Sequence, residues 1–405
     1  MTQTQNNHNH QTNILVIGGG IAGTATACYL AQNGHKVTLL EQNELATEAS
    51  GLNAGTIWAA GWGHIPDLTS TLSMGSLEIF KTLQLDLGYD IEFRQSGSLQ
   101  AIQTEEQYAF AQQEVHDLTA AGHQLELLPA RDARGIEPEL SPHILGCLYY
   151  PHGGNANPVK TVQALASLAQ QHGATILTHH QVTGITHLDD GTYQIVTPPA
   201  TFKAGTLVLA AGPWCLSLGA LLGLHIPVYA VRGQMWATAP LPPRIFHSIG
   251  ALESHYYWHT YPYSDEQTPL ELTHHHDQRL TRHLYGRQTR DGHIIFGGDR
   301  QLDAPKTPDQ SGIETNHSHA LELFPFLKDL PIARTWAGWM PFTRDLHPLI
   351  GKIPQLENLY LLTGLSSSGL EKGMMAGRLL AEFIHNGTAS PVLTEADPGR
   401  WVVSG

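Results

Sequence analysis

One stretch near the start of the chain, residues 13–41, constrains the fold more than any other. An apolar run at 14–17 precedes a glycine-rich turn at 18–23. An alanine-rich segment then leads to a second apolar run that ends in Glu41. This order predicts a β-strand, a tight turn, an α-helix and a second strand, as in the first part of a Rossmann-like α/β domain.

The glycines of this turn are spaced for a dinucleotide. Gly18 permits the tight turn, Gly20 lets the backbone approach a pyrophosphate, and Gly23 lets the helix pack close to the strand. The free N–H groups and the positive helix end then face the phosphates. Glu41 follows Gly23 by 18 residues, near the spacing of about 20 at which a carboxylate binds ribose hydroxyls. The motif predicts a dinucleotide site and leaves NAD and FAD open.

The composition and net charge of the chain disfavour some classes of binding partner. The 405 residues suffice for two domains, and 22 Lys and Arg against 36 Asp and Glu give a net charge of −14, which disfavours nucleic acid. We expect no transmembrane segment, because no run of about 18 apolar residues occurs. Three widely spaced cysteines (Cys28, Cys147 and Cys215) indicate reduced thiols and a cytoplasmic location.

The polar start of the chain and its histidines suggest no further site. Residues 1–11 are rich in Asn, Gln and His, and we expect a disordered leader. Residues 274–276 are three consecutive histidines, but adjacent side chains on an extended chain point to opposite faces and no HExxH motif occurs. We therefore predict no metal site.

Two segments of small residues fit a second part of the same cofactor site. Residues 46–56 contain almost only short side chains, as expected where the backbone wraps a bulky planar cofactor. Near the C-terminus an apolar strand at 359–363 leads into a serine-rich loop at 364–369 and a helix at 370–383. A strand, loop and helix at each end of the chain predict that both termini build one domain.

The middle of the chain differs from its ends. Residues 225–300 contain β-rich runs with many aromatic residues, including one at 254–263, and predict a mainly antiparallel sheet with a polar excursion or lid at 264–282. We predict a discontinuous FAD-binding domain from residues 12–90, 146–224 and 331–405. The substrate domain comprises residues 91–145 and 225–330.

Taken together, these motifs resemble the FAD-dependent amine and D-amino-acid oxidoreductases, a superfamily that includes glycine oxidase, sarcosine oxidase and dimethylglycine dehydrogenase. The resemblance covers nearly the whole chain. It rests on residues 14–41, 49–55, 207–214, 232–234, 296–298, 336–351 and the helix after Gly364. It implies FAD rather than NAD, in a Rossmann-like domain beside an antiparallel-sheet substrate domain.

The resemblance also implies which residues surround the cofactor. The adenosine half would lie on the first turn, on the acidic end of the second strand and near residue 182, and the isoalloxazine between residues 49–56 and 365–371. The helix N-terminus at the latter loop would stabilise negative charge on the reduced ring. The candidate cofactor-binding residues are Gly18, Gly20, Ile21, Ala22, Gly23, Glu41, Gln42, Ala49, Ser50, Asn53, Ala54, Gly55, Thr56, Val182, Ala211, Gly212, Trp214, Gly338, Leu365, Ser366, Ser368, Gly369 and Leu370.

The chain departs from the family pattern where the substrate should bind. Carboxylate-binding arginines of glycine-oxidase-like members are matched by Met340 and Ser367, and two lysines of sarcosine-oxidase-like members are matched by Glu371 and Ile295. Residue 59 is alanine where dimethylglycine-dehydrogenase-like members carry a flavin-linked histidine, so we predict non-covalent FAD.

Another cation must replace the missing clamp if the substrate is a simple amino acid, because a charge-assisted bond contributes about 1.5–3 kcal/mol. Arg232 is the first choice for this role. Together with Met340, Ser367 and Glu371 it makes up our set of candidate catalytic residues. Arg94, Arg287, Arg344 and His347 are further candidates, and Tyr256, Tyr257, Trp258, His259 and Tyr285 would form either an aromatic wall or a sheet core.

The resemblance implies oxidation of the C–N bond of an amino acid, N-alkyl amino acid or other amine. Hydride moves from the carbon next to the amine to flavin N5, giving an imine that hydrolyses, with O2 or another electron acceptor completing the cycle. Little acid–base machinery is needed, since the site mainly orients the C–H bond and excludes water. An FAD-dependent 2-hydroxy-acid dehydrogenase and a non-catalytic flavin-binding assembly partner stay open, as does a homo-oligomer.

Overall fold

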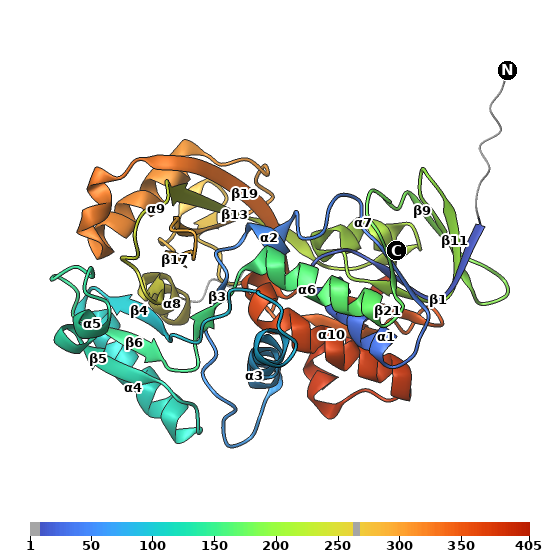
Figure 1. Ribbon diagram of the computed structural model, residues 1–405, viewed down its shortest axis with the longest axis horizontal. Coiled ribbons are helices and arrows are strands. Elements are labelled where there is room, and N and C mark those ends of the chain that lie inside the picture. The colour runs from blue at the N-terminus through green and yellow to red at the C-terminus, as the bar shows by residue number, and fades with distance from the viewer. Residues whose placement is uncertain (1–8, 262–267) are drawn as a thin grey trace.

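The computed structural model describes residues 9–261 and 268–405, which form two domains lying side by side (Figure 1). One domain is built on a mostly parallel sheet and the other on a largely antiparallel sheet. The parallel-sheet domain contains both the N-terminal strand β1 and the C-terminal helix α10, as expected for a domain assembled from the two ends of the chain. The mixed α/β fold predicted from the sequence is confirmed.

The first sheet has the strand order β20-β21-β11-β1-β2-β8, with β9 and β10 extending it beside β11. The pairs β1–β2, β1–β11, β2–β8 and β11–β21 are parallel, and β20 is antiparallel to β21. The strands are β1 (Asn9–Ile17), β2 (Val37–Leu40), β8 (Thr175–Leu177), β9 (Gly184–His187), β10 (Tyr193–Val196), β11 (Thr201–Leu209), β20 (Leu349–Lys352) and β21 (Leu359–Thr363).

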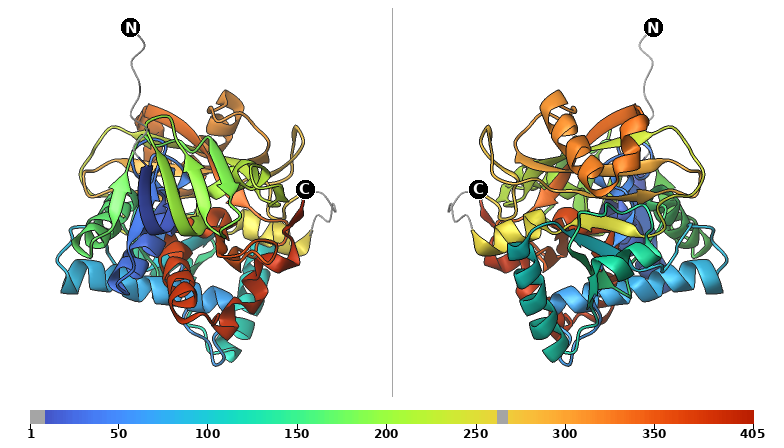
Figure 2. Two further views of the ribbon diagram at one scale, coloured as in Figure 1. Left: turned by 90° about the vertical axis from the view of Figure 1, so that its right-hand side faces the viewer. Right: turned by 90° about the vertical axis from the view of Figure 1, so that its left-hand side faces the viewer.

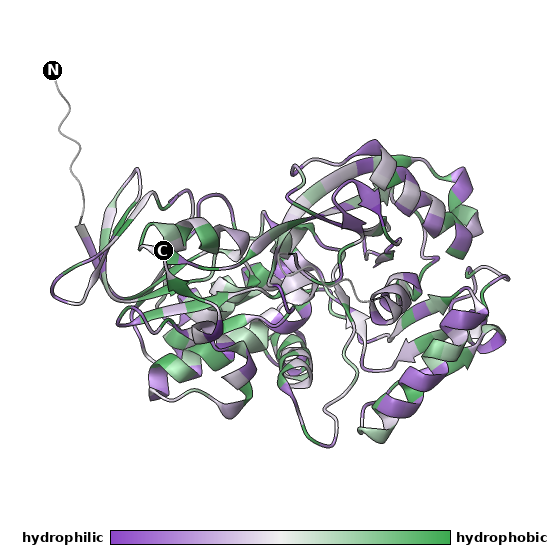
Figure 3. Ribbon diagram, turned by 180° about the vertical axis from the view of Figure 1, so that it is seen from behind, coloured by the Kyte–Doolittle hydropathy of each residue, from purple (hydrophilic) through white to green (hydrophobic). Residues whose placement is uncertain are grey.

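Helices cover this sheet because its strands are apolar on both faces. Ile14 and Val16 face a core shared with four helices, whereas Leu15 and Ile17 face a second core with β9–β11 and α7. Figure 2 shows α10 beneath the strands, and Figure 3 shows apolar residues gathered in the sheet and on the inner helix faces. The helices are α1 (Ile21–Gln32), α3 (Leu68–Lys81), α6 (Pro158–Gln171), α7 (Cys215–Ala220) and α10 (Gly369–Asn386).

The second sheet has the order β19-β13-β18-β17-β14-β4-β6-β5, in which only β4 and β14 pair in parallel. Helices α4 and α5 lie beside one end of this sheet, and α9 lies beside the other (Figure 1). The elements are β4 (Ser98–Ile102), α4 (Glu105–Ala120), β5 (Glu126–Pro129), α5 (Ala130–Ile136), β6 (Gly146–Tyr150), β13 (Tyr229–Thr238), β14 (Ser248–Ala251), α8 (Glu253–Thr260), β17 (Tyr285–Gln288), β18 (Ile294–Leu302), α9 (Gln310–Leu323) and β19 (Ile332–Phe342).

Short elements connect the two domains and complete the chain. They are α2 (Ala49–Leu52), β3 (Thr56–Ile57), β7 (Gly154–Asn155), β12 (Leu224–His225), β15 (His274–His275), β16 (Gln278–Arg279), β22 (Val403–Ser404), a π-helical turn at Thr82–Asp86 and 3₁₀ turns at Gly212–Trp214, Pro325–Asp329, Ser366–Ser368, Pro391–Ala396 and Pro398–Arg400.

The predicted domain boundaries differ from the sheets in two places. The prediction places residues 146–150 and 332–342 in the FAD-binding domain, but β6 and β19 pair within the second sheet. Strand β6 lies between β4 and β5, and β19 pairs with β13 over nearly its whole length. Backbone pairing with partners far along the chain places these two strands, and no local pattern carries that information.

Two local expectations also need correction. Residues 1–8 of the predicted leader lie outside the described residues, but His10 and Gln11 belong to β1, where they pair with Phe202 and Lys203 of the longer strand β11. The aromatic run expected as strand material at 254–263 forms helix α8 as far as Thr260. In a helix, residues four positions apart share a face, so these aromatic side chains are divided between different surroundings.

In the described ranges, 9–261 and 268–405, no helix is long and apolar enough to cross a membrane. The three cysteines are buried free thiols. Among the same residues no group of three or more His, Cys, Asp or Glu side chains is arranged to hold a metal ion.

Candidate active site

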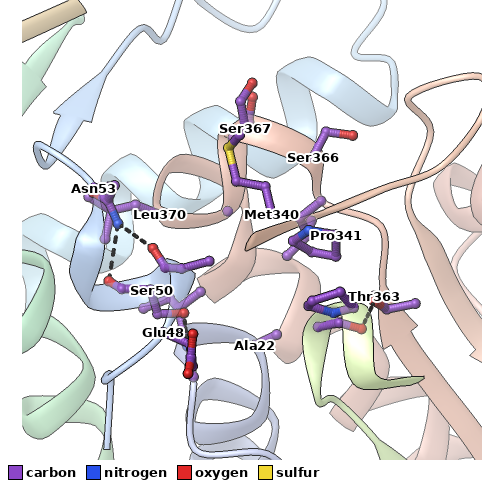
Figure 4. A pocket seen from close by; sticks show the side chains of 18 of the residues that line it. Ala22, Glu48, Ser50, Asn53, Met340, Pro341, Thr363, Ser366, Ser367 and Leu370 are labelled. Atoms are coloured by element: carbon purple, nitrogen blue, oxygen red, sulfur yellow. Dashed lines mark hydrogen bonds between the residues drawn. The ribbon is translucent and has the colours of Figure 1, made fainter. Parts of the chain in front are cut away.

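A single cavity of about 460 Å³ connects the glycine turn of the first domain with the second sheet. Its walls come from the β1–α1 turn, α2, the end of β2, the loop before α10, helix α8 and strand β18. Figure 4 shows Ser50 and Asn53 on one side of this cavity and Met340, Pro341 and Ser366 on the other. The segments predicted to surround the cofactor thus meet around one space.

The β1–α1 turn approaches the cavity with almost no side chain. Gly18 has a backbone φ angle of +120°, which residues other than glycine rarely adopt. A Cβ on Gly23 would lie 1.9 Å from the carbonyl oxygen of Gly18, and a Cβ on Gly20 would lie 2.8 Å from Ser50 Oγ. The three glycines therefore let helix α1 begin close to the strand and leave room for a ligand above the turn.

Glu41 follows β2 and is fixed by two backbone donors. Its Oε2 accepts a hydrogen bond from the Gly19 N–H (2.7 Å), and its Oε1 accepts one from the Asn43 N–H (2.9 Å). The carboxylate lines the cavity next to Gln42, and Val182 lines the same region. This is the position of the ribose-binding acid in a dinucleotide site.

Helix α2 forms a rigid wall rather than a flexible linker. Asn53 Nδ2 donates to the carbonyl oxygens of Ala49 (3.0 Å) and Ser50 (3.1 Å), and its Oδ1 accepts from the Gly55 N–H (2.8 Å). Ser50 Oγ in turn accepts from the Ile21 N–H at the start of α1 (2.9 Å). These bonds hold α2 against the N-terminus of α1.

The loop before α10 closes the opposite side. The 3₁₀ turn at Ser366–Ser368 runs into α10, and the N-cap residue Ser368 makes no capping hydrogen bond with its side chain. Its backbone donors and positive end therefore stay open to an anionic or electron-rich ligand at the cavity. A negatively polarised flavin edge fits this donor set.

Most of the candidate cofactor-binding residues line the cavity, but Gly23, Ala54, Gly55 and Gly338 do not. These four residues do not face the cavity, although residues close to them in the chain form its wall. A Cβ on Gly55 would lie 2.1 Å from the Ala156 carbonyl oxygen, and one on Gly338 would lie 2.8 Å from a methyl carbon of Leu52. These glycines allow elements to pack closely, so no side chain could occupy their positions without moving the wall.

Several cavity residues were missed by the sequence interpretation. Glu48, Trp58, His180 and Thr363 line the cavity beside the residues that were named. Glu48 lies inside the segment 46–56 that the sequence analysis assigned to the cofactor wall but was not named there. Trp58, His180 and Thr363 lie within two positions of residues 56, 182 and 364, so extending these motifs slightly would have included them.

Arg287 supports the α2 wall from below. Its Nη2 donates to the Ala156 carbonyl oxygen (3.0 Å), its Nε donates to the Ala54 carbonyl oxygen, and burial lowers its pKa to about 10. It does not line the cavity. Arg94, Arg344 and His347, the other reserve cations, do not line it either.

On the substrate side, Met340, Ser367 and Glu371 line the cavity, but Arg232 does not. Arg232 is buried, and its Nη2 lies 2.5 Å from the Asp309 carboxylate and 2.7 Å from Gln301 Oε1. Asp309 caps the N-terminus of α9. The structure therefore places Arg232 in an ion pair that anchors α9 and corrects its proposed place beside the substrate.

Arg300 is the cation that the sequence interpretation missed. Its side chain lines the cavity with 8% exposure, Nη2 donates to Ser367 Oγ (3.0 Å), and Nη1 donates to Glu271 Oε2 (2.8 Å). The guanidinium carbon lies 4.4 Å from the centre of the Trp258 ring. A cation from β18 thus reaches Ser367, the position at which the resemblance led us to expect an arginine. In the sequence, the motif at 296–298, which includes two glycines, lies two positions before Arg300 and could have drawn attention to it.

His283 shares the surroundings of Arg300. Its Nδ1 lies 2.7 Å from Ser254 Oγ and its Nε2 lies 3.4 Å from Arg300 Nη2. Burial, then the charge of Arg300, holds the pKa of His283 well below its usual value. Since a guanidinium only donates, Nε2 is the acceptor and the neutral ring carries its proton on Nδ1.

Glu371 and Tyr285 complete this half of the cavity. Glu371 stands in the first turn of α10, its Oε2 accepts from the Trp58 N–H (3.0 Å), and burial raises the pKa of its carboxyl. Burial also raises the pKa of Tyr285 to about 12. Burial thus disfavours the charged form of both side chains, and Arg300 is the one Lys or Arg among the described residues that line the cavity.

The fold and this cavity define a class of protein: a two-domain dinucleotide-binding protein with a substrate chamber between its sheets. The chain belongs to the family of FAD dependent oxidoreductases (DAO), whose sequence model matches residues 13–383. It is an enzyme of the FAD-dependent amino acid oxidase and dehydrogenase family, as predicted.

Known proteins with similar sequences and structures agree with this assignment. The chain is 27% identical to mitochondrial dimethylglycine dehydrogenase of Mus musculus over 96% of its own length, but spans only 44% of that protein. It is 25% identical to glycine oxidase of Geobacillus kaustophilus, covering 93% of each chain. The crystal structure of L-proline dehydrogenase from P. horikoshii superimposes with a TM-score of 0.82 at 25% identity, covering 97% of this chain and 98% of that one.

Proposed function

We propose that this enzyme oxidises the C–N bond of an amino acid or N-alkyl amino acid with non-covalently bound FAD. The observation that carries the proposal is Arg300, a nearly buried cation in the cavity that the flavin-binding segments enclose. When bound, FAD supplies the hydride acceptor. The residues of the chain supply binding, orientation and exclusion of water.

Arg300 is the proposed binding site for the substrate carboxylate. Two of its present contacts, Ser367 Oγ and His283 Nε2, are neutral acceptors. A carboxylate that displaces these acceptors, or Glu271 on Nη1, forms a hydrogen-bonded ion pair with the guanidinium, which a neutral acceptor does not. Because Ser367 belongs to the loop before α10, a carboxylate on Arg300 places the neighbouring carbon beside the flavin-binding wall.

The substrate amine reacts as the neutral base, and the cavity favours that form. His283 is held neutral with Nε2 as an acceptor, because burial and the charge of Arg300 lower its pKa. Burial raises the pKa of the Glu371 carboxyl, which disfavours its charged form. The closed aromatic side formed by Trp258 and Tyr285 excludes water from the imine that results.

Anaerobic reduction of the bound flavin tests the proposal. We expect amino acids and N-alkyl glycines to bleach its absorbance and 2-hydroxy acids to leave it unchanged. Bleaching by hydroxy acids alone would instead support a 2-hydroxy-acid dehydrogenase. If dithionite were the only reductant that works, a non-catalytic flavin-binding partner would be the better description.

Non-covalent attachment is supported by the alanine at residue 59 and by the cysteines, none of which lines the cavity. Acid precipitation should release the yellow cofactor into the supernatant, and colour that stays with the pellet would contradict this. Reoxidation of the bleached enzyme in air, compared with reoxidation by an artificial dye, then distinguishes O2 from another electron acceptor.

A further inference from the structure

A second cavity of about 410 Å³ lies directly beside the active-site cavity. His255, Trp258 and Glu271 line both spaces, so the boundary is one side chain thick. The outer cavity is bounded by α8, by residues 268–272, by β15 and by the end of β18. Its size lies within the range of about 300–1,000 Å³ that small-molecule pockets occupy.

The boundary between the two cavities depends on Arg300. Glu271 Oε2 accepts from Arg300 Nη1 (2.8 Å), and the Trp258 ring lies against the guanidinium at 4.4 Å while its Nε1 donates to the Leu272 carbonyl oxygen (2.8 Å). Glu271 has φ +56° and its side chain is 37% exposed. A carboxylate that binds Arg300 competes with Glu271 and loosens the boundary at that point.

The lining of the outer cavity excludes one class of ligand. Its charged residues are Glu271 and Asp303, and among the described residues that line it there is no Lys or Arg. An anionic group would meet two carboxylates and no Lys or Arg side chain among these described residues. Apart from the hydroxyl of Thr268, the remaining walls are apolar, aromatic or imidazole: His255, Tyr257, Trp258, His259, Tyr261, Pro269, Leu270, Leu272, His274, His275, His276, Leu280, Leu302 and Leu346.

We infer that the outer cavity takes an uncharged aromatic or alkyl extension of the substrate. The inference rests on the proposed function in one respect, that the substrate carboxylate binds Arg300. A molecule held there contacts Trp258 and Glu271, the two side chains that separate the cavities. The substrate class is therefore an amino acid or N-substituted amino acid with a long apolar substituent.

Carboxylates without an amine test this without any turnover. Acetate, hexanoate, 4-phenylbutanoate and hexanedioate are titrated into the holoenzyme, and each Kd is read from the perturbation of the flavin spectrum. We expect hexanoate and 4-phenylbutanoate to bind at least about 10-fold more tightly than acetate, because they bury apolar surface. Hexanedioate should bind no more tightly than acetate, since its second carboxylate faces Glu271 and Asp303.

A second test fills the outer cavity with a larger side chain. Leu302 lines only the outer cavity, so Leu302→Trp should weaken hexanoate and 4-phenylbutanoate about 10-fold while leaving acetate within about twofold. Leu216→Trp, at an exposed leucine of α7, is the matched control. Leu280→Trp repeats the test if the first variant loses its FAD.

Equal Kd values along the series, or a Leu302→Trp enzyme that keeps the preference for long carboxylates, would overturn the inference. The outcome is independent of the oxidation chemistry. If long carboxylates bind tightly but no amine bleaches the flavin, the proposed function fails while the outer cavity keeps its assignment. If amines bleach the flavin but chain length has no effect, the reverse holds.

Discussion

The two halves of the active-site cavity are built in different ways. The cofactor half consists of backbone and small side chains, with Gly18, Gly20 and Ser50 next to helix N-termini. The substrate half consists of long side chains, chiefly Arg300, Trp258 and Glu371, which come from β18, α8 and α10. A wall made of backbone requires particular residues, such as glycine, at fixed spacings in the sequence. A long side chain, in contrast, can reach the same place in the cavity from any of several helices or strands.

The largest effect is expected in the cofactor half. Gly23→Ala places a methyl group where a Cβ would lie 1.9 Å from the Gly18 carbonyl oxygen, so α1 must move away from β1. We expect a loss of about 3 kcal/mol of stability or more, together with loss of bound FAD. Chemical denaturation and the flavin-to-protein absorbance ratio measure the two effects.

Gly135→Ala is the matched control, because Gly135 lies in α5 with no atom within 4 Å of its added Cβ. Its stability should change by less than about 1 kcal/mol, with unchanged FAD content. A Gly23→Ala enzyme that kept its flavin would show that the turn tolerates side chains and would weaken the contrast between the halves.

In the substrate half, Arg300→Ala should leave FAD content unchanged and weaken carboxylate ligands. Loss of charge-assisted bonds of about 1.5–3 kcal/mol corresponds to a roughly 10- to 150-fold rise in Kd for acetate. Titration of the flavin spectrum measures it. Arg334→Ala, which removes an arginine packed on Trp336 outside the cavity, is the control. An unchanged Kd for acetate in the Arg300→Ala enzyme would show that Arg300 does not bind the carboxylate.

Glu371 lies where the two halves meet, and its substitution should change how stability depends on pH. Its folded-state pKa is raised by burial, so its contribution to stability is fully present below the unfolded-state pKa of about 4.3 and is lost as pH rises through the folded pKa. Glu371→Gln cannot ionise and keeps an acceptor for the Trp58 N–H. The variant should therefore gain stability relative to the wild type between pH 4 and pH 8.

Denaturation curves at several pH values measure this difference. A constant offset between Glu371→Gln and the wild type from pH 4 to pH 8 would mean that the carboxyl titrates normally. The FAD-free protein provides the comparison, since it separates the burial of Glu371 from any charge interaction with the cofactor.

The smallest effect is expected at an ion pair near the surface that joins the segment after β18 to the segment before α2. Lys306 Nζ lies 2.6 Å from Glu48 Oε1, with 36% and 22% of the two side chains exposed. Exposed pairs contribute about 0–1 kcal/mol and are screened by salt. Lys306→Ala should cost less than about 1 kcal/mol, and less still in 1 M salt, with Lys203→Ala at an exposed pair within one sheet as control. A loss of stability above about 1 kcal/mol would show that the contact between these two segments contributes more than an exposed ion pair does.

The same contrast explains which parts could be predicted. The β1–α1 turn, the segment at 49–56 and the loop before α10 were recognised because each depends on residues close together in the chain. The aromatic run at 254–260 was expected as a strand and is helical, since its composition suits a strand whereas contacts of α8 with other elements decide its form.

The amino-acid sequence by itself determined the dinucleotide motif, the α/β fold and most of the cavity wall that is built from small residues, because tight turns and helix N-termini impose local spacing. Only the tertiary structure decided which of the two arginines on this sheet lines the cavity. Arg232 and Arg300 stand on paired strands of one sheet, yet Arg232 turns to Asp309 and Arg300 turns to Ser367. That choice depends on which elements pack against each face of the sheet, and those contacts join residues far apart in the chain.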